Sequence, residues 1–452
     1  MELLFRKIQA SIDEYLQNPT REILLVDGAR QTGKSYIIRN SGNKLFENYV
    51  EINLLEDSLK DRMFANVKTT EDFYIRLGSI AGDKLDRKEN TLVFLDEIQV
   101  YPELITLFKF LRRDDLYTYI SSGSLLGVTL AETSSVPVGS LSIIKMYPLD
   151  FEEFLYAMGF GAAAVEAVRE QLMAGNALDE ALHNRLMEMF RRYLIIGGLP
   201  AAVNTYLETH NIVKVRAVHE MISKLYRADA SKYDSDRKLK IERIYDMIPS
   251  SLENKKKRLV YKDIRDVKGD RAANYQDEFD YLINSGIALN VDAVSNPAFP
   301  LIETSSKNLI KLYLNDVGLL TNVYYRNTVR PILEDVRSIN LGTVYETAVA
   351  QELKAHGFPL FYYDNRKNGE VDFLIDDYIG LNVIPIEVKS GRDYTIHRAV
   401  TKFVSQENYG IDNGIVLSND RNIWTDGKLK YMPIYSVMFL SNVPADVNSL
   451  YF

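Results

Sequence analysis

The sequence predicts an α/β protein of several domains. The chain has 452 residues, and a domain typically has about 150, so roughly three domains are expected. Near the N-terminus an apolar run leads through a glycine-containing loop into a helical pattern, and near the C-terminus two strand-like runs carry carboxylates. Hydrophobic residues make up 46% and charged residues 26% of the chain, which is typical of globular proteins.

Composition excludes several classes of chemistry. The chain has no cysteine, which excludes disulfides, thiolate nucleophiles, iron–sulfur clusters and cysteine-type zinc sites. Its 5 histidines are dispersed and form no His-Glu-x-x-His pair, so we expect any metal on carboxylates and hydroxyls, as for magnesium or manganese. The net charge of -8 argues against coating nucleic acid or membranes through bulk charge. With no signal-like or membrane-length apolar run, the sequence predicts a cytoplasmic protein with no membrane partner.

The first predicted site follows the strand-like run at residues 23–27. Strand, loop and helix in this order make a concave anion site from loop amides and a helix N-terminus. A lysine in the loop reaches the β and γ phosphates, and a following serine hydroxyl ligates Mg²⁺. The sequence therefore predicts bound ATP and Mg²⁺ at the loop formed by Gly28, Ala29, Arg30, Gln31, Thr32, Gly33, Lys34 and Ser35.

Two further strand ends supply groups for the same site. Residues 91–95 are apolar and end in Asp96 and Glu97, the pattern of a Walker B strand. We expect Asp96 to hold Mg²⁺ together with Ser35, and Glu97 to orient or deprotonate the attacking water. Residues 116–120 lead into a serine-rich end, where Ser122 or Ser124 would sense the γ-phosphate. The alternative for these serines is an ordinary Ser/Gly turn.

The middle of the chain combines helical patterns with a basic segment. Residues 151–206 have helical spacing of apolar residues and predict a helical lid. Between residues 237 and 271 there are 12 Lys or Arg and 6 Asp or Glu, a local net charge of +6 (12 minus 6).

Secondary-structure patterns in and after the basic segment predict a winged helix. Helical patterns at 241–252, 261–267 and 275–284, followed by strand-like runs at 287–291 and 309–314, give the order of elements in that module. Contacts to DNA phosphates are predicted for Lys255, Lys256, Lys257 and Arg258. The alternative is a solvated basic loop in a module that packs against protein.

The C-terminal third holds a second constellation of charged residues. Glu346 falls on a helical pattern, Asp372 on a strand, and Glu387 and Lys389 on one face of the next strand. Asp followed by Glu-x-Lys resembles the PD-(D/E)XK nucleases. The resemblance implies that Asp372 and Glu387 hold Mg²⁺ at a scissile phosphate, that Lys389 activates water or stabilises the developing charge, and that Glu346 completes the metal shell. The alternative is an exposed cross-strand salt bridge between Glu387 and Lys389.

Motifs along nearly the whole chain carry a resemblance to one family. They lie at residues 28–35, 94–104, 122–126, 148–155, 193–200 and 311–320. Together they resemble the prokaryotic AAA+-type ATPases that carry an uncharacterised nuclease-like C-terminal domain. In that family a Gly-Arg pair usually precedes the Pro-Leu-Ser-Phe motif, whereas here Gly139 is followed by Ser140. If that arginine is a trans-acting finger, this chain uses another residue or hydrolyses ATP slowly.

These patterns and the resemblance predict four domains. They are an AAA+-type P-loop ATPase core at 1–155, a helical lid at 156–210, a winged-helix-like module at 211–305 and a restriction-endonuclease-like α/β domain at 306–452. The predicted function is ATP binding and hydrolysis that controls a DNA-binding winged helix and a nuclease-like domain. The alternative is an ATP-switched regulator that docks a protein partner through an inactive nuclease-like domain. A small-molecule kinase would leave most of these motifs unused, and the oligomeric state stays open.

Overall fold

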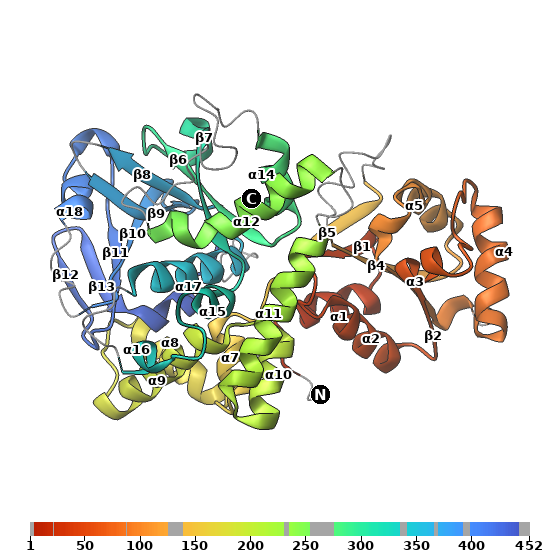
Figure 1. Cartoon of the computed structure of the whole chain (residues 1–452), viewed down its shortest axis with the longest axis horizontal. Helices are drawn as coiled ribbons and strands as arrows, with labels where there is room; N and C mark the ends of the chain where they lie inside the picture. The colour runs from red at the N-terminus through yellow and green to blue at the C-terminus, as the bar shows by residue number, and fades with distance from the viewer. Residues whose placement is uncertain are drawn as a thin grey trace. The chain divides into compact units, whose positions relative to one another are not determined.

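The structure is a computed structural model of the whole chain, drawn in Figure 1. It describes residues 4–20, 22–86, 88–124, 139–229, 235–253, 275–334, 341–365, 369–391 and 398–442. The chain divides into two compact units. The N-terminal unit comprises Phe5–Tyr147 and Asp280–Ile287, and the C-terminal unit comprises Met1–Leu4, Pro148–Phe279 and Ala288–Phe452.

A five-stranded parallel sheet forms the centre of the N-terminal unit. Its order is β2-β3-β4-β1-β5, and each neighbouring pair is parallel. All five carboxyl ends therefore meet at one edge, where ligands bind in open α/β sheets. The strands are β1 (Ile23–Asp27), β2 (Asn48–Asn53), β3 (Thr91–Asp96), β4 (Thr118–Gly123) and β5 (Leu141–Lys145).

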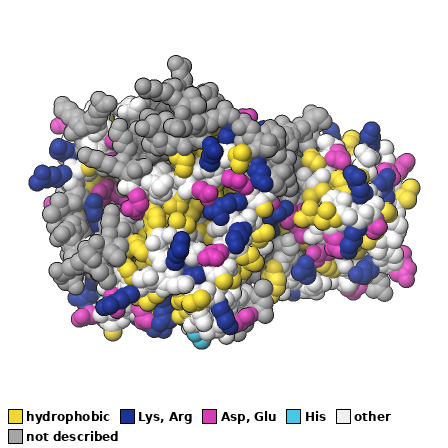
Figure 2. Space-filling view, in the orientation of Figure 1, with side chains coloured by type: hydrophobic (Ala, Val, Ile, Leu, Met, Phe, Trp, Pro, Cys, Tyr) yellow, Lys and Arg dark blue, Asp and Glu magenta, His cyan; other side chains and the backbone are white. Residues whose placement is uncertain are grey.

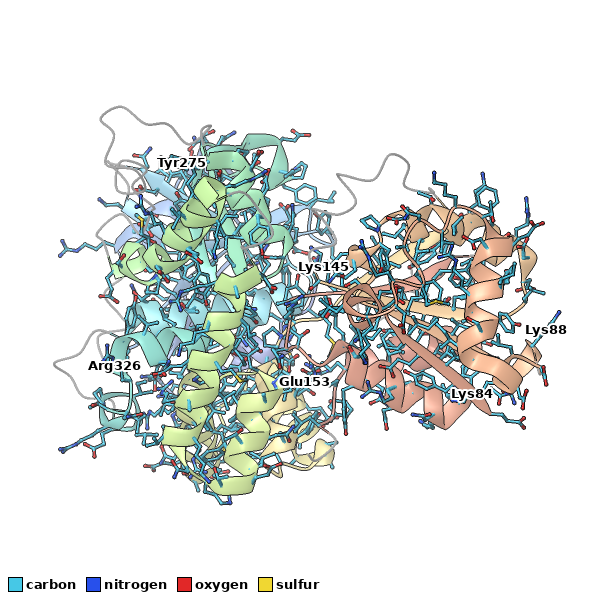
Figure 3. The ribbon with its side chains drawn as sticks, turned by 45° about the vertical axis from the view of Figure 1, so that its right-hand side comes forward. Lys84, Lys88, Lys145, Glu153, Tyr275 and Arg326 are labelled. Carbon is cyan, nitrogen blue, oxygen red and sulfur yellow. The ribbon has the colours of Figure 1, made fainter. Side chains whose placement is uncertain are left out.

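Both faces of this sheet are buried because its strands alternate between two apolar clusters. Ile23 and Leu25 of β1 belong to one cluster, and Leu24 and Val26 belong to the other, as the period of two requires. The helices of this unit include α1 (Ile8–Gln17), α2 (Lys34–Leu45), α3 (Leu54–Leu59), α4 (Thr70–Ala81) and α5 (Glu103–Asp114). The short turns after α4 carry the exposed Lys84 and Lys88 (Figure 3).

The C-terminal unit begins with helices, as the sequence predicts for the lid region. They are α7 (Phe151–Ala157), α8 (Ala162–Met173), α9 (Glu180–Ile196), α10 (Pro200–Thr209), α11 (Ile212–Asp229) and α12 (Ser235–Glu253). In α9 the apolar residues recur at helical spacing, and Leu186, Met189, Phe190 and Tyr193 are buried. None of the described helices is long and apolar enough to cross a membrane.

A mixed eight-stranded sheet forms the rest of this unit, in the order β12-β13-β11-β10-β9-β8-β6-β7. The strands are β6 (Ala288–Val294), β7 (Ser305–Leu314), β8 (Phe361–Asn365), β9 (Gly369–Asp377), β10 (Asn382–Val388), β11 (Gly414–Ser418), β12 (Trp424–Asp426) and β13 (Leu429–Pro433). The helices here include α15 (Val317–Tyr325), α16 (Arg330–Leu333), α17 (Gly342–Ala355) and α18 (Arg398–Val404). Helix α14 (Gln276–Asn284) is divided between the two units, with Phe279 as the last residue assigned to this one. Helix α17 contacts β6, β7 and β10, and its residues from Thr343 to Leu353 are all buried.

The structure changes the interpretation of the predicted winged helix. Two of its helical patterns fall in α12 and α14, and its two strand-like runs fall in β6 and β7, which pair antiparallel. However, β6 also pairs in parallel with β8, so these strands belong to the large sheet rather than to a separate two-stranded wing. The expected boundary between residues 305 and 306 lies inside β7. The helical pattern at 261–267 lies outside the described residues.

Candidate functional sites

The predicted phosphate loop connects β1 to α2 in the N-terminal unit. Gly33 has a φ of 98° at the start of α2, a backbone conformation that favours glycine. A Cβ at Gly28 would lie 2.2 Å from the carbonyl oxygen of Met146, so the loop admits no side chain there. From the N-terminal segment, the Arg6 guanidinium donates to the carbonyl oxygen of Thr32 at 2.9 Å. The loop therefore lies close to the Met146 backbone and is hydrogen-bonded by Arg6.

Lys34 lies inside this loop. Its Nζ donates to the carbonyl oxygens of Gly28 at 2.7 Å and Ala29 at 2.8 Å. Burial lowers the pKa of Lys34, although the nearby carboxylates of Glu97, Asp27 and Asp96 oppose that shift. A buried ammonium held by carbonyl dipoles is suited to an anionic ligand, which would neutralise its charge.

Ser35 and Asp96 meet directly, as predicted for a magnesium site. The Ser35 hydroxyl lies 3.0 and 2.9 Å from the two carboxylate oxygens of Asp96. The Ser122 hydroxyl also donates to Asp96, and the Asn53 side-chain amide donates to it at 3.3 Å. Burial raises the pKa of Asp96, while the Ser122 hydrogen bond lowers it. A hydroxyl beside a carboxylate supplies the oxygen ligands that Mg²⁺ prefers, so the residues present fit the ion.

Glu97 and Ser124 meet around a residue that sequence reasoning missed. Glu97 adopts a left-handed backbone conformation with φ 59° and ψ 46°, which is strained for a non-glycine residue. The Gln99 side-chain amide donates to Glu97 Oε2 and, at 3.1 Å, to Ser124 Oγ. The Ser124 backbone N–H donates to Gln99 Oε1 at 3.2 Å. Gln99 therefore bridges the predicted base and the predicted sensor.

The two serines consequently lie in different surroundings. Ser122 contacts Asp96, on the side of the predicted metal. Ser124 lies beside Glu97, with its hydroxyl 3.5 Å from Glu97 Oε2. Of the two residues that the sequence offered as the γ-phosphate sensor, Ser124 is the one next to the predicted base. The sequence gave only weak signals for two other residues of this site. Asn53 is a polar residue at the end of β2, the strand beside β3, and Gln99 follows the Asp96-Glu97 pair by two positions.

The second predicted constellation is assembled in the C-terminal unit. Strands β9 and β10 are antiparallel, with Phe373 opposite Ile386, so Asp372 and Glu387 are neighbours. Asp372 Oδ2 accepts a hydrogen bond from the Val388 backbone N–H at 2.9 Å. Burial raises the pKa of Glu387 well above its ordinary value, and the charges of Asp372 and Glu346 raise it further. All three predicted carboxylates therefore interact.

Lys389 lies 2.6 Å from Glu387, measured from Nζ to Oε1. The salt bridge of the alternative interpretation is therefore present, but the Glu387 side chain is only 7% exposed, so the pair is largely buried on its acidic side. The other oxygen, Oε2, is buried and has no hydrogen-bond partner among the described residues. A buried carboxylate oxygen left without a donor beside a second carboxylate fits a cation.

Further side chains surround this constellation, and the sequence analysis gave them no role in it, although Lys311 and Tyr313 lie in the motif at residues 311–320. The Tyr313 hydroxyl of β7 donates to Glu346 Oε2 at 3.2 Å. Lys311, two residues earlier, is completely buried, forms an ion pair with Glu370 of β9 and lies over the Tyr362 ring at 4.3 Å from its centroid. Tyr313, Lys311 and Glu370 come from β7 and β9, outside the Asp and Glu-x-Lys pattern, so that pattern gave no signal for them.

The predicted nucleic-acid contacts Lys255, Lys256, Lys257 and Arg258 lie outside the described residues. Two basic residues in the described part of the same segment pair with acidic residues of α14. Arg237 lies 3.1 Å from Asp277, and Lys240 lies 3.7 Å from Glu278. On the face shown in Figure 2, basic and acidic side chains are interspersed over the described surface.

Three family models match separate parts of the chain. Residues 20–155 match the model described as AAA domain. Residues 187–329 and 341–437 match two domains of unknown function, DUF8612 and DUF4143. Residues 20–155 are therefore similar to an AAA domain, which supports the AAA-type P-loop class predicted for this part of the chain.

Individual relatives are distant. The uncharacterized protein MJ1637 of Methanocaldococcus jannaschii is 22% identical over 448 residues, covering 94% of this chain and 86% of that protein. The Walker-type ATPase PABY2304 of Pyrococcus abyssi is 14% identical with a TM-score of 0.44, covering 71% of this chain and 96% of that one. Cdc6p from Pyrobaculum aerophilum is 12% identical with a TM-score of 0.26, covering 74% and 96%.

Proposed function

We propose that this protein binds and hydrolyses ATP with Mg²⁺, and that its nucleotide state controls a nuclease-like C-terminal unit that acts on DNA. The observation that carries the proposal is the contact between Ser35 and Asp96, which joins two motifs 61 residues apart into one site. Phosphate-loop and Walker B groups that touch each other form the working arrangement of a P-loop ATPase.

Each residue of the ATP site has a role. Loop amides and Lys34 would bind the phosphates, and Ser35 and Asp96 would hold Mg²⁺, which would neutralise phosphate charge. Glu97 takes up the proton of the attacking water, while Gln99 orients Glu97. Ser124, hydrogen-bonded to the same Gln99, links the γ-phosphate position to this base. Lys34 must leave the carbonyls of Gly28 and Ala29 to reach the ligand.

The nuclease-like proposal is supported by four side chains predicted from the sequence alone. Glu346, Asp372, Glu387 and Lys389 come from α17, β9 and the end of β10, and their charges interact. Asp372 and Glu387 would hold Mg²⁺, which supplies Lewis-acid stabilisation of a scissile phosphate. Lys389 would then be released from Glu387 to donate to the developing charge.

A second candidate is a docking regulator with an inactive nuclease-like unit. It is favoured by the tight pair of Lys389 and Glu387 and by the acidic partners of Arg237 and Lys240. In that case the charged cluster stabilises the fold, and the nucleotide state controls a protein partner instead of DNA.

Divalent-dependent cleavage of linear duplex DNA tests the choice. We expect cutting by the wild type with Mg²⁺ or Mn²⁺ and loss of cutting in Asp372→Asn. Asp376→Asn is the matched control, because Asp376 is also buried on β9 but accepts from the Leu301 backbone N–H instead. No cutting by the wild type on DNA or RNA would favour the docking regulator. Equal cutting by Asp372→Asn would remove the site assignment.

A further inference from the structure

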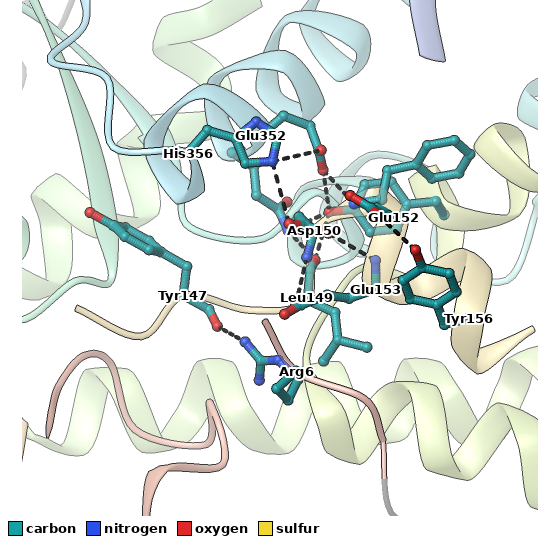
Figure 4. A network of polar contacts seen from close by, with 12 residues as sticks. Arg6, Tyr147, Leu149, Asp150, Glu152, Glu153, Tyr156, Glu352 and His356 are labelled. Atoms are coloured by element: carbon teal, nitrogen blue, oxygen red, sulfur yellow. Dashed lines mark hydrogen bonds and ion pairs between the residues drawn. The ribbon is translucent and has the colours of Figure 1, made fainter. Parts of the chain in front are cut away.

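Three ionisable side chains from distant parts of the chain converge inside the C-terminal unit. Asp150 precedes α7, whereas Glu352 and His356 lie at the end of α17, one helical turn apart. One ligand atom from each lies within 4.8 Å of the other two. Figure 4 shows the three side chains turned toward one another. None of them belongs to the ATP site or to the Asp372 cluster.

One oxygen of each carboxylate accepts hydrogen bonds from neighbouring segments of the protein. Asp150 Oδ1 accepts from the Glu153 backbone N–H at 2.8 Å and so caps α7. Glu352 Oε1 accepts from the Phe151 backbone N–H at 2.7 Å and from the Tyr193 hydroxyl at 3.1 Å. These contacts fix both carboxylates in place before any ligand binds.

The second oxygen of each carboxylate faces the same imidazole nitrogen. His356 Nε2 lies 3.3 Å from Asp150 Oδ2 and 4.0 Å from Glu352 Oε2. An ion with bonds of about 2.0–2.2 Å to nitrogen and oxygen holds its ligand atoms roughly 3–3.5 Å apart. Closing the cluster around such an ion requires side-chain shifts of about 1 Å.

Charge balance favours a divalent ion here. The side chain of Asp150 is 5% exposed, that of Glu352 is 0% exposed and that of His356 is 9% exposed. Burying two carboxylates is costly, and a divalent ion carries enough positive charge to match both while the neutral imidazole binds it.

We propose that Asp150, Glu352 and His356 bind a divalent first-row transition-metal ion, with Zn²⁺ as the probe. One imidazole and two carboxylates suit Zn²⁺ better than Mg²⁺, which prefers oxygen alone. Because the ligands are buried and come from segments far apart in the chain, we assign the ion a role in stabilising the fold. It joins the segment that enters α7 to the end of α17, about 200 residues further along the chain.

Metal binding to the nucleotide-free full-length protein tests the proposal. After removal of metal with a chelator and dialysis against Zn²⁺, we expect about one tightly bound ion per chain in Asp372→Asn, in which the other predicted metal cluster is disabled. His356→Gln in that background should lose this ion. His183→Gln is the matched control, since His183 is also buried and contacts the Tyr435 hydroxyl, and it should keep the ion.

Two readouts keep the proposal testable if His356→Gln folds poorly. In the otherwise wild-type protein, Zn²⁺ should raise the Tm by several degrees and the chelator should reverse that rise. Co²⁺ in place of Zn²⁺ should give visible absorption bands that Glu352→Gln loses. Absence of tight Zn²⁺ binding in Asp372→Asn, or retention of the ion in His356→Gln, would overturn the proposal and leave His356 as an imidazolium partner of the two carboxylates.

Discussion

Replacing Gln99 by alanine tests whether the residue next to the Walker B carboxylates positions the catalytic base. Gln99 donates to Glu97 and to Ser124 Oγ, and it accepts from the Ser124 backbone N–H. Glu97 itself has a strained backbone conformation. Removing the Gln99 amide should leave the Glu97 backbone in place. The Glu97 carboxylate, without this hydrogen bond, should then be free to rotate away from the attacking water.

The magnitude follows from the hydrogen bond to a charged group. Such a bond contributes about 1.5–3 kcal/mol, and about 1.4 kcal/mol corresponds to a tenfold change in rate. Gln99→Ala should thus lower the kcat of ATP hydrolysis about 10- to 100-fold. The KM for ATP should change little, because the hydrogen bonds of Gln99 go to Glu97 and Ser124.

Steady-state ATP turnover and fluorescent-nucleotide binding measure the two quantities separately. Gln171→Ala is the matched control, because the Gln171 amide donates to the Ala177 carbonyl oxygen in the C-terminal unit, and its kcat should equal that of the wild type. A Gln99→Ala enzyme with unchanged kcat, or one whose whole loss is in nucleotide binding, would refute the role of Gln99 as a positioning residue.

Three other changes have defined outcomes. Gly28→Ala should lower the free energy of unfolding by about 1–3 kcal/mol in urea titrations, because the new methyl group would meet the Met146 carbonyl oxygen at 2.2 Å. Glu97→Gln should bind ATP but turn it over far more slowly, so filter binding should recover uncleaved ATP. Burial raises the pKa of Asp316, which accepts from the Gly198 backbone N–H at 2.6 Å, to about 6 from 3.8. The stability linked to this proton is fully present below about pH 3.8 and is lost as the pH rises through about 6, a decrease of about 3 kcal/mol. Asp316→Asn should flatten that part of the pH dependence of urea unfolding, and an unchanged profile would contradict the assignment.

Local motifs identified the residues of the predicted ATP site because each of them lies in a short segment of sequence, and the structure places Ser35 beside Asp96. The loop from Gly28 to Ser35 and the Asp96-Glu97 pair each follow a strand, and strands of a parallel sheet place such ends at one edge. The same reasoning brought Asp372 and Glu387 together, since the period of two fixes which side chains share a face.

Partners that depend on packing could not be predicted in this way. In the sequence Gln99 is an ordinary polar residue after a strand. Its role depends on its contacts with Ser124 at the end of β4, which only the folded structure shows. Asp150 and Glu352 are 202 positions apart, and no spacing rule connects them. The two strands taken for a wing, β6 and β7, lie in the large sheet because β6 pairs with β8 along its other edge, a pairing that joins distant segments and leaves no local pattern.

ATP turnover by the full-length protein tests the central claim most directly, measured with and without duplex DNA over a series of salt concentrations. Lys34→Ala serves as the blank, and Lys44→Ala is the matched control, because Lys44 is an exposed residue of the same helix that pairs with Asp13. We predict that duplex DNA stimulates ATP turnover and that this stimulation falls steeply as the salt concentration rises. Lys34→Ala should abolish turnover, whereas Lys44→Ala should retain it. Turnover that persists in Lys34→Ala would contradict the ATP-site assignment, and turnover that ignores DNA at every salt concentration would contradict the proposed coupling to DNA.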